Sequence, residues 1–389
     1  TDNETDRVFS ELTDGELPFN FEVVYNDDTD IDIILHNAEE RILVEDVVFG
    51  RNKSTLEDTI RINFPLFDTY ITGRYEENRI EGFWTVNYRD NYKVPFKAEF
   101  GRDHRFTNLK KPPKADLSGN WETTFEIGTE YEYKGIGEFQ QEGNKLTGTF
   151  RTETGDYRFL EGTVQDNKAY LSCFDGSHAF LFQAKIMEGD SLIGSFRSGS
   201  HYLTTWSANQ NSTFQLTNPN DLTYIKGQEK FYFTFPNTDG RMVSIDDEAF
   251  SNKPLLVTIF GTWCPNCRDE MEFLKDYIKE NRDLDFNVVG IAFERYKDEK
   301  KSMDVIERYK EKMEIPFDLL YAGYYDKDEA GGQLPMLNKV ISYPTLIYID
   351  KQRNVRQIHT GFSGPATSKY DDFTEEFDEL VRNLVNEEN

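Results

Sequence analysis

The pattern of hydrophobic and polar positions changes character near residue 220. Up to about residue 206, short runs of alternating aromatic and polar residues recur on either side of turn residues, as at 137–140 and 146–150. Such alternation predicts antiparallel strands, because successive side chains of a strand point to opposite faces of its sheet. We therefore predict an N-terminal all-β antiparallel sandwich or barrel whose many aromatic side chains pack within the sheets.

Beyond residue 220 the pattern alternates between strand and helix. Unbroken apolar runs at 255–260 and 286–293 predict buried strands, and apolar residues at helical spacing predict helices at 265–279 and 302–312. Further strands are expected at 230–235, 241–245, 317–321 (at a sheet edge), 344–350 and 354–359, before a final helix that carries Phe373 and Phe377. These elements predict a small α/β sandwich, so the fold class is multidomain, with an all-β region followed by an α/β domain.

A chain of 389 residues is expected to form two to three domains. We predict a disordered acidic leader at 1–15 and a β-rich domain at 16–110. Residues 111–220 would form a second β-rich domain or the second half of the same region, and 221–389 the α/β domain. The boundaries are inferred from a stretch of lysine and proline at 110–114 and from a polar, asparagine-rich stretch at 208–220.

The motif Trp263-Cys264-Pro265-Asn266-Cys267 lies where the predicted strand 255–260 passes into a helix. Unpaired N–H groups and the helix dipole favour a negative charge at a helix N-terminus, so we expect Cys264 to be the more reactive thiol. Cys267 lies close enough to form a disulfide with Cys264, and such a pair takes up and releases two electrons. A zinc site is the alternative, but zinc takes four ligands, and the chain has three Cys and five His without a second close pair. The motif therefore favours redox chemistry without a metal.

The C-terminal segment resembles the thioredoxin-fold domains of the TlpA/ResA type, often labelled redoxin. The matching residues are those at 260–270, the run Ser342-Tyr343-Pro344-Thr345 before an apolar strand, and then Asp350 and Gly361. The resemblance covers somewhat less than half of the chain. It implies a thioredoxin fold and a thiol–disulfide oxidoreductase that reduces protein disulfides and needs no cofactor.

The resemblance also implies roles for individual residues. Cys264 would attack the substrate disulfide, and Cys267 would resolve the mixed disulfide after giving its proton to Glu270. Thioredoxins proper carry an Asp six residues before the first Cys, but Thr258 stands there and cannot titrate, which leaves Glu270 as the candidate base. Pro344 is expected to follow a cis peptide bond that exposes the preceding backbone to a substrate strand.

The remaining candidate residues, Trp263, Pro265, Asn266 and Tyr343, are expected to border the groove that binds the substrate. Tyr343 stands where smaller residues are common in the relatives, and the pair between the thiols is not the one found in thioredoxin. The direction of electron flow therefore does not follow from the motif. The partners implied are protein or small-thiol disulfides as substrates, and a membrane-bound or soluble electron donor.

Charge bears on location and partners. A net charge of −27 argues against nucleic acid and anionic membranes as partners, and no apolar run is long enough to span a membrane. The sequence shows no signal peptide but starts at Thr1 without Met, so we expect a processed or trimmed product. The resemblance implies the periplasmic side of a bacterial cell envelope, with a lipid anchor as one option; a cytosolic thioredoxin-like protein is the alternative.

Two other functions have to be weighed. A peroxiredoxin-like peroxidase resembles the pattern Pro-x-x-x-Thr/Ser-x-x-Cys, but Val257 and Gly261 stand at the corresponding positions before Cys264. The second alternative is a protein that binds a ligand or partner through the β region and whose redox site is vestigial. The third cysteine, Cys173, alternates with Ala169 and Leu171 and is predicted to lie in a sheet core.

Overall fold

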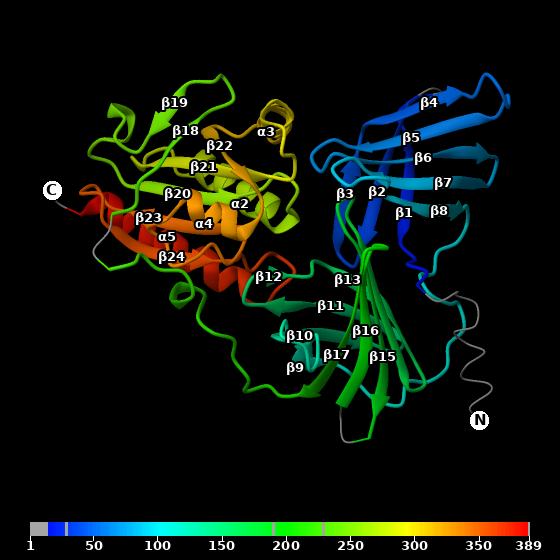
Figure 1. Cartoon of the computed structure of the whole chain (residues 1–389). Coiled ribbons are helices and arrows are strands. Elements are labelled where there is room, and N and C mark those ends of the chain that lie inside the picture. The colour runs from blue at the N-terminus through cyan, green and yellow to red at the C-terminus, as the bar shows by residue number, and fades with distance from the viewer. Residues whose placement is uncertain (1–14, 28–29, 189–190, 228–229, 388–389) are drawn as a thin grey trace. The chain divides into compact units, whose positions relative to one another are not determined.

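The computed structural model describes residues 15–27, 30–188, 191–227 and 230–387 (Figure 1). The chain divides into two compact units, one of residues 1–152 with 157–216 and the other of residues 153–156 with 217–389. Residues 1–14 of the predicted leader lie outside the described residues. Four residues from the middle of the β-rich sequence thus belong to the C-terminal unit.

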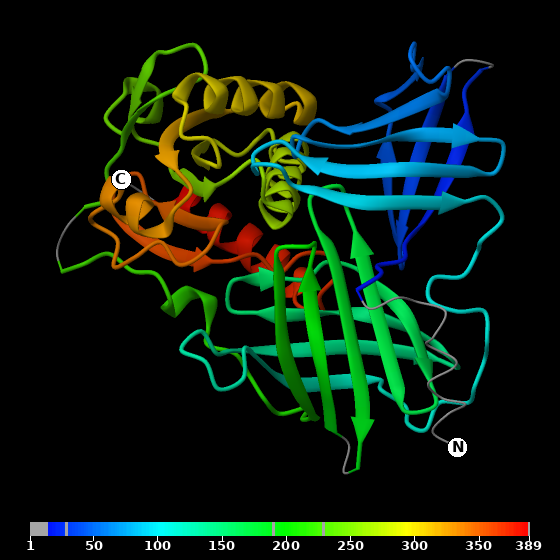
Figure 2. The same ribbon diagram turned by 45° about the vertical axis from the view of Figure 1, so that its right-hand side comes forward.

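The first part of the N-terminal unit contains two antiparallel sheets around one core. Three strands pair in the order β1-β2-β3 and five in the order β4-β5-β6-β7-β8 (Figure 2). Buried positions alternate along β2, as expected for a strand with one face against a core. The strands are β1 (Asn20–Tyr25), β2 (Ile31–Asn37), β3 (Glu40–Val44), β4 (Val47–Arg51), β5 (Asp58–Phe64), β6 (Thr69–Glu76), β7 (Arg79–Val86) and β8 (Lys93–Glu99).

The second part of the N-terminal unit is a closed antiparallel barrel. β9 pairs with β10 on one side and with the last strand, β17, on the other, and β10 also pairs with β11. The remaining strands follow in chain order around the barrel, which confirms the all-β region. The strands are β9 (Gly119–Phe125), β10 (Tyr133–Glu142), β11 (Lys145–Thr152), β13 (Leu160–Gln165), β14 (Lys168–Phe174), β15 (Ala179–Met187), β16 (Ser191–Ser198) and β17 (Tyr202–Gln210); the two-residue β12 (Gly155–Asp156) follows β11 in the chain.

Aromatic side chains fill the barrel. Phe182 stacks on Phe196 with ring centroids 4.3 Å apart, and Phe150 lies 4.6 Å from Phe182 and 5.2 Å from Trp206. Cys173 belongs to the same buried cluster, and burial raises the pKa of its thiol well above the usual range. These aromatic residues therefore serve packing, as their alternation predicts, and Cys173 is a core residue.

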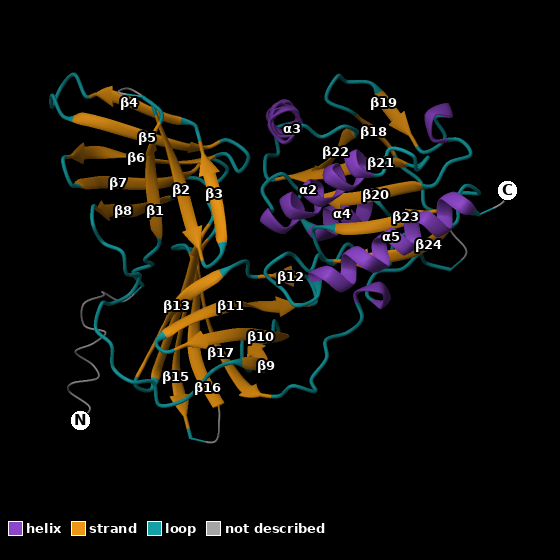
Figure 3. Cartoon of the chain, turned by 180° about the vertical axis from the view of Figure 1, so that it is seen from behind, coloured by secondary structure: helices purple, strands orange, loops and turns teal. Residues whose placement is uncertain are grey.

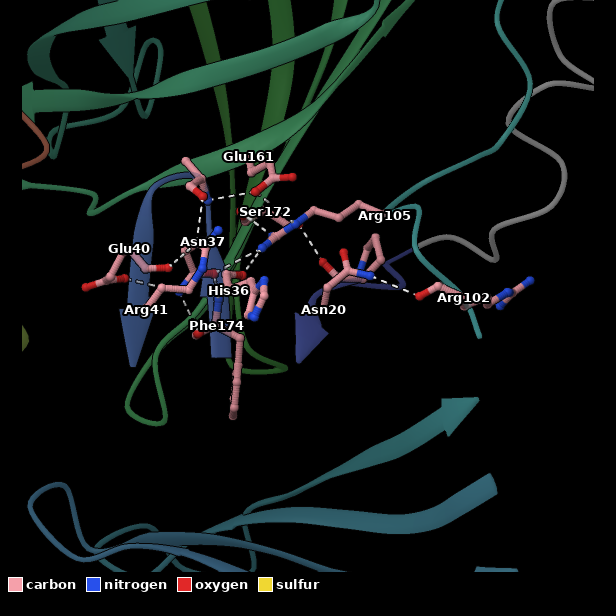
Figure 4. A network of polar contacts seen from close by, with 12 residues as sticks. Asn20, His36, Asn37, Glu40, Arg41, Arg102, Arg105, Glu161, Ser172 and Phe174 are labelled. Carbon is pink, nitrogen blue, oxygen red and sulfur yellow. Dashed lines mark hydrogen bonds and ion pairs between the residues drawn. The ribbon is translucent and has the colours of Figure 1, made fainter. Parts of the chain in front are cut away.

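A buried arginine links the two parts of the N-terminal unit (Figure 4). The guanidinium of Arg105 donates to the carbonyl and hydroxyl oxygens of Ser172 at 3.0 Å each, to the carbonyl of His36, and to Asn37 Oδ1 at 3.3 Å. The Glu161 carboxylate lies 3.8 Å from Arg105 Nε. Because a buried charge is costly unless it is hydrogen-bonded and paired, these contacts hold β2 against the barrel strand β14.

The C-terminal unit is built on a five-stranded sheet in the order β22-β21-β20-β23-β24. β20, β21 and β22 are parallel, whereas β23 and β24 form an antiparallel hairpin beside β20. The strands are β20 (Leu255–Phe260), β21 (Asn287–Glu294), β22 (Asp318–Tyr324), β23 (Thr345–Ile349) and β24 (Val355–Thr360). A separate hairpin of β18 (Thr234–Pro236) and β19 (Met242–Ser244) precedes the sheet. This confirms the α/β domain, with the strand predicted at 317–321 at the sheet edge.

The helices are α2 (Pro265–Glu280), α3 (Glu299–Met313), α4 (Lys327–Gln333) and α5 (Tyr370–Asn386). α2 packs against α5 (Figure 3), with the ring of Phe377 lying 4.8 Å from those of Phe273 and Tyr277. All six residues of β20 are buried, which explains the unbroken apolar run. Among the described residues, no helix combines the length and hydrophobicity that a transmembrane span requires.

Candidate active site

The two cysteines lie at the start of α2. Cys264 is the N-cap residue, and its Sγ accepts a hydrogen bond from the backbone N–H of Cys267 at 3.3 Å. Pro265 occupies the first helical turn, where a missing N–H costs nothing. Both cysteines are free thiols, and Cys264 is 7% exposed whereas Cys267 is 0% exposed. Cys264 is thus the thiol nearer to solvent.

Cys267 and Glu270 share the buried face of α2. Burial raises the pKa of Cys267 well above its usual value, and the adjacent Cys264 adds to this effect. Burial also raises the pKa of Glu270 to about 8, although a hydrogen bond from Thr258 acts in the opposite direction. The Glu270 carboxyl is therefore mostly protonated at neutral pH and exchanges its proton near pH 8.

The partner of Glu270 is the residue that replaces the aspartate of thioredoxins. Thr258 Oγ1 donates to Glu270 Oε2, while Glu270 Oε1 has no hydrogen-bond partner among the described residues. A buried carboxyl oxygen without a partner is expected to take part in function or to bind a water molecule. The structure thus places Thr258 and Glu270 together, with Glu270 close enough to Cys267 to affect its pKa.

The cis-proline segment lies directly against Cys264. The Tyr343–Pro344 peptide bond is cis, as predicted. The Cys264 thiol donates to the carbonyl oxygen of Tyr343 at 3.4 Å, and the Pro344 carbonyl accepts from the backbone N–H of Gly361 at 2.9 Å. Two segments that are 79 residues apart in sequence are therefore brought together at one sulfur atom.

Aromatic rings and a cation surround Trp263, the residue before Cys264. The ring of Trp263 lies 5.6 Å from that of Tyr343 and 5.4 Å from that of Tyr325, and its Nε1 donates to the carbonyl of Phe293 at 3.0 Å. The guanidinium of Arg295 lies 4.2 Å from the centroid of the Trp263 ring. Trp263 and Tyr343 are thus held beside the thiol, whereas the sequence analysis did not find Tyr325 and Arg295.

Glu294 is another residue that the sequence analysis missed. It ends β21, is buried, and accepts from the backbone N–H of Thr262 at 3.0 Å and from its hydroxyl at 2.8 Å. Burial raises the pKa of the Glu294 carboxyl to about 7. Glu294 therefore fixes the loop that leads into Cys264. Its only signal in the sequence is an acid placed directly after the apolar run at 286–293.

Asn266, which lies between the two cysteines, contacts a residue that is distant in sequence. Its side-chain Nδ2 donates to the backbone carbonyl of Asp156 at 3.3 Å, across 110 residues of sequence. Both residues belong to the C-terminal unit. Within the described part of the chain, no three or more His, Cys, Asp or Glu side chains are grouped to hold a metal ion.

The raised pKa of Glu270 predicts how stability depends on pH. A carboxyl with an ordinary pKa of 4.5 when unfolded and about 8 when folded keeps its proton in the folded state over that range. Stability is therefore lost as the pH rises from about 4.5 to about 8. Glu270→Gln cannot ionise and should be more stable than the native chain at about pH 8, by on the order of a few kcal/mol, with little gain at about pH 4.

Urea unfolding at both pH values, followed by circular dichroism, measures this difference. Glu272→Gln, on the same helix but half-buried, is the matched control and should show no such dependence. An equal effect of Glu270→Gln at both pH values would contradict a buried neutral carboxyl.

The Glu294 contacts predict a second stability effect. Glu294→Ala leaves two buried donors of Thr262 without their acceptor, which should cost about 1–3 kcal/mol per unsatisfied group. Glu294→Gln keeps one acceptor oxygen and should cost less. Thermal unfolding measures the cost, and the rate of Cys264 alkylation reports whether the loop has moved. Equal stability of Glu294→Ala and the native chain would show that the carboxylate does not support the loop.

Comparison with known proteins agrees with this geometry. The Redoxin family model matches residues 226–373. The thioredoxin-like protein YneN of Bacillus subtilis is 26% identical over 136 residues, which is 35% of this chain and 72% of that protein. An uncharacterised protein of Haemophilus influenzae is 27% identical over 115 residues, which is 30% of this chain and 69% of that protein.

Two bacterial thiol–disulfide proteins are among the solved structures that match part of this chain. A thiol:disulfide interchange protein from Chlorobium tepidum has a TM-score of 0.31 at 22% identity and covers 40% of this chain and 94% of its own. A thiol-disulfide oxidoreductase from Bacteroides fragilis has a TM-score of 0.29 at 22% identity and covers 38% and 96%. The family match is the finding that bears on identity: the C-terminal part of this chain carries a Redoxin domain with a thioredoxin-like fold.

Proposed function

We propose that this protein is a thiol–disulfide oxidoreductase that reduces protein disulfides through Cys264 and Cys267. One observation carries the proposal: the Cys264 sulfur caps α2 and also lies 3.4 Å from the Tyr343 carbonyl, at the cis-proline segment. The Redoxin match and the similarity to the thioredoxin-like protein YneN support it.

In the first step, the thiolate of Cys264 attacks one sulfur of the substrate disulfide. A bond forms between Cys264 and that sulfur, the substrate S–S bond breaks, and the second substrate sulfur leaves as a thiolate that takes a proton from water. The attacking sulfur, Cys264 Sγ, accepts a hydrogen bond from the Cys267 N–H. The product is a mixed disulfide between Cys264 and the substrate.

In the second step, Cys267 resolves the mixed disulfide. It gives its proton to the ionised carboxylate of Glu270 and attacks Cys264 Sγ, and the first substrate sulfur leaves as a thiolate. Because the pKa of Glu270 is about 8, this step should become faster as the pH approaches that value and more carboxylate is present. Two electrons have then passed to the substrate, and the protein holds a Cys264–Cys267 disulfide.

A donor must then return two electrons to the disulfide, and we propose a membrane-bound or soluble dithiol protein for this role. We further propose a location outside the cytoplasmic membrane, on the periplasmic side of a bacterial cell envelope, with a lipid anchor as one option. The resemblance of the motifs to TlpA/ResA-type proteins supports this location. A trapping experiment in the native compartment would identify both the donor and the substrate.

The alternative functions have less support. For a peroxidase, Val257 and Gly261 offer no hydroxyl group that would orient a peroxide toward Cys264. For a protein that binds a ligand or partner through the β region, a ligand site inside the barrel has little support, because buried side chains such as Trp121, Phe150 and Phe182 pack there. The dithiol reaction is therefore the function that the geometry supports best.

The unequal exposure of the two thiols predicts different effects of their substitution. Cys267→Ser should accumulate mixed disulfides through Cys264, because the attacking thiol remains and the resolving thiol is lost. Cys264→Ser should not reduce insulin disulfides. Cys173→Ala, which changes the thiol buried in the barrel, is the control and should keep the activity of the native chain. Full activity of Cys264→Ser would contradict the proposal.

The residues around Cys264 also predict slow reaction with peroxide. Because Val257 and Gly261 replace the proline and the hydroxyl-bearing residue of the peroxiredoxin pattern, reduced protein should react with hydrogen peroxide no faster than an ordinary reactive thiol. Stopped-flow tryptophan fluorescence, to which Trp263 next to Cys264 contributes, follows this reaction. A rate in the range of dedicated peroxidases would favour the peroxidase alternative.

A further inference from the structure

Residues 153–156 contact segments that lie near Cys264. The hydroxyl of Ser342 donates to the carbonyl of Thr154 at 2.7 Å, and Asn266 Nδ2 donates to the carbonyl of Asp156 at 3.3 Å. The backbone N–H of Gly364 donates to the Asp156 carboxylate at 2.8 Å. All of these residues belong to the C-terminal unit, so the contacts are internal to it.

The three donors come from three different segments of the C-terminal unit. Asn266 lies between the two cysteines, Ser342 immediately precedes the cis Tyr343–Pro344 bond, and Gly364 follows β24. The hydroxyl of Ser342 also lies 3.3 Å from the Tyr343 carbonyl, which is the group that Cys264 contacts. Residues 153–156 therefore connect segments that lie near Cys264, which is the more exposed thiol of the pair.

The segment fits this place closely. A Cβ atom added to Gly155 would lie 2.2 Å from Asn266 Nδ2, and the φ of Gly155 is +136°, a value that other residues rarely adopt. A Cβ atom added to Gly361 would lie 3.0 Å from the carbonyl carbon of Thr154. Glycine at 155 thus fits both its positive φ and the neighbouring Asn266 side chain, and glycine at 361, with φ +80°, fits the close approach of the Thr154 backbone.

The chemistry of these contacts is that of peptide recognition. The segment offers backbone carbonyl oxygens to side chains beside the cis-proline, which is what an extended substrate peptide would offer there. We propose that residues 153–156 form a specificity-determining segment, which occupies part of the surface where a protein disulfide must dock beside Cys264. The proposal rests on the proposed function, since it names what limits access to that same thiol.

This arrangement separates substrates by size. A protein disulfide brings flanking backbone that competes with residues 153–156 for Asn266 and Ser342, so the segment must be displaced first. A small disulfide needs only the sulfur atom. The segment should therefore slow the reaction of Cys264 with protein disulfides and large reagents, and leave its reaction with small ones nearly unchanged.

Two variants of the full chain test this. Asp156→Ala removes the acceptor of Gly364 N–H, and Gly155→Ala introduces a methyl group against Asn266. Each should raise the rate of insulin reduction about threefold to tenfold, the change expected when one hydrogen bond no longer holds a segment closed. Reduction of glutathione disulfide should change by less than about twofold.

The matched control is Gly143→Ala, in the turn between β10 and β11. Gly143 also has a positive φ, +59°, but a Cβ atom there would meet nothing within 4 Å. It should therefore show the strain of the substitution without any change in the ratio of the insulin rate to the glutathione disulfide rate. Circular dichroism checks that each variant is folded, and Asp156→Ala adds no atoms if Gly155→Ala fails to fold.

A second readout does not depend on turnover. In the Cys267→Ser background, alkylation of Cys264 by a maleimide carrying a polyethylene glycol chain should speed up in both variants, while alkylation by iodoacetamide should not. An unchanged or lower ratio of the two alkylation rates in folded Asp156→Ala would overturn the role of the segment. A raised ratio, together with failure of the chain that keeps both Cys264 and Cys267 to reduce either disulfide, would instead overturn the proposed function and leave the segment's role standing.

Discussion

The removal of Cys267 and Glu270 from water is the constraint on which the site depends. Both side chains are fully buried on one face of α2, and burial makes the charged form of each unfavourable. Cys267 and Glu270 thus both tend to keep their protons at neutral pH, while Cys264, held at the end of the helix, keeps its access to solvent. The two thiols are chemically identical, so their different roles follow from their different burial and not from their residue type.

The parts of the site that are local in sequence could be predicted from it. The helix at 265–279 and the buried strands at 255–260 and 286–293 follow from apolar periodicity, the cis Tyr343–Pro344 bond is implied by the family resemblance, and the structure contains them. α4 was missed because its sequence, with two glycines and one buried alanine, has no apolar repeat. Its start depends on Asp326, whose side chain caps the N–H groups of Asp328 and Glu329.

Contacts between distant residues could not be predicted in the same way. The alternating pattern indicates strands, but sandwich and barrel differ only in whether β9 meets β17, which no local pattern records. The same holds for Glu294, whose bonds to Thr262 join residues 32 positions apart, and for Asn266 and Asp156. Such pairings are selected by the packing of whole sheets, so a single sequence shows the residues without their partners.

The position of residues 153–156 in the chain has a consequence for the order of events during synthesis. Their partners Ser342 and Gly364 follow 188 and 208 residues later than Thr154 and Asp156. Since a chain emerges from its N-terminus and its domains fold largely as they appear, the barrel strands on both sides of the segment are complete long before β23 exists. Residues 153–156 are therefore already present when Cys264 is synthesised. Their contacts with Ser342 and Gly364 can form only after nearly the whole chain has been made.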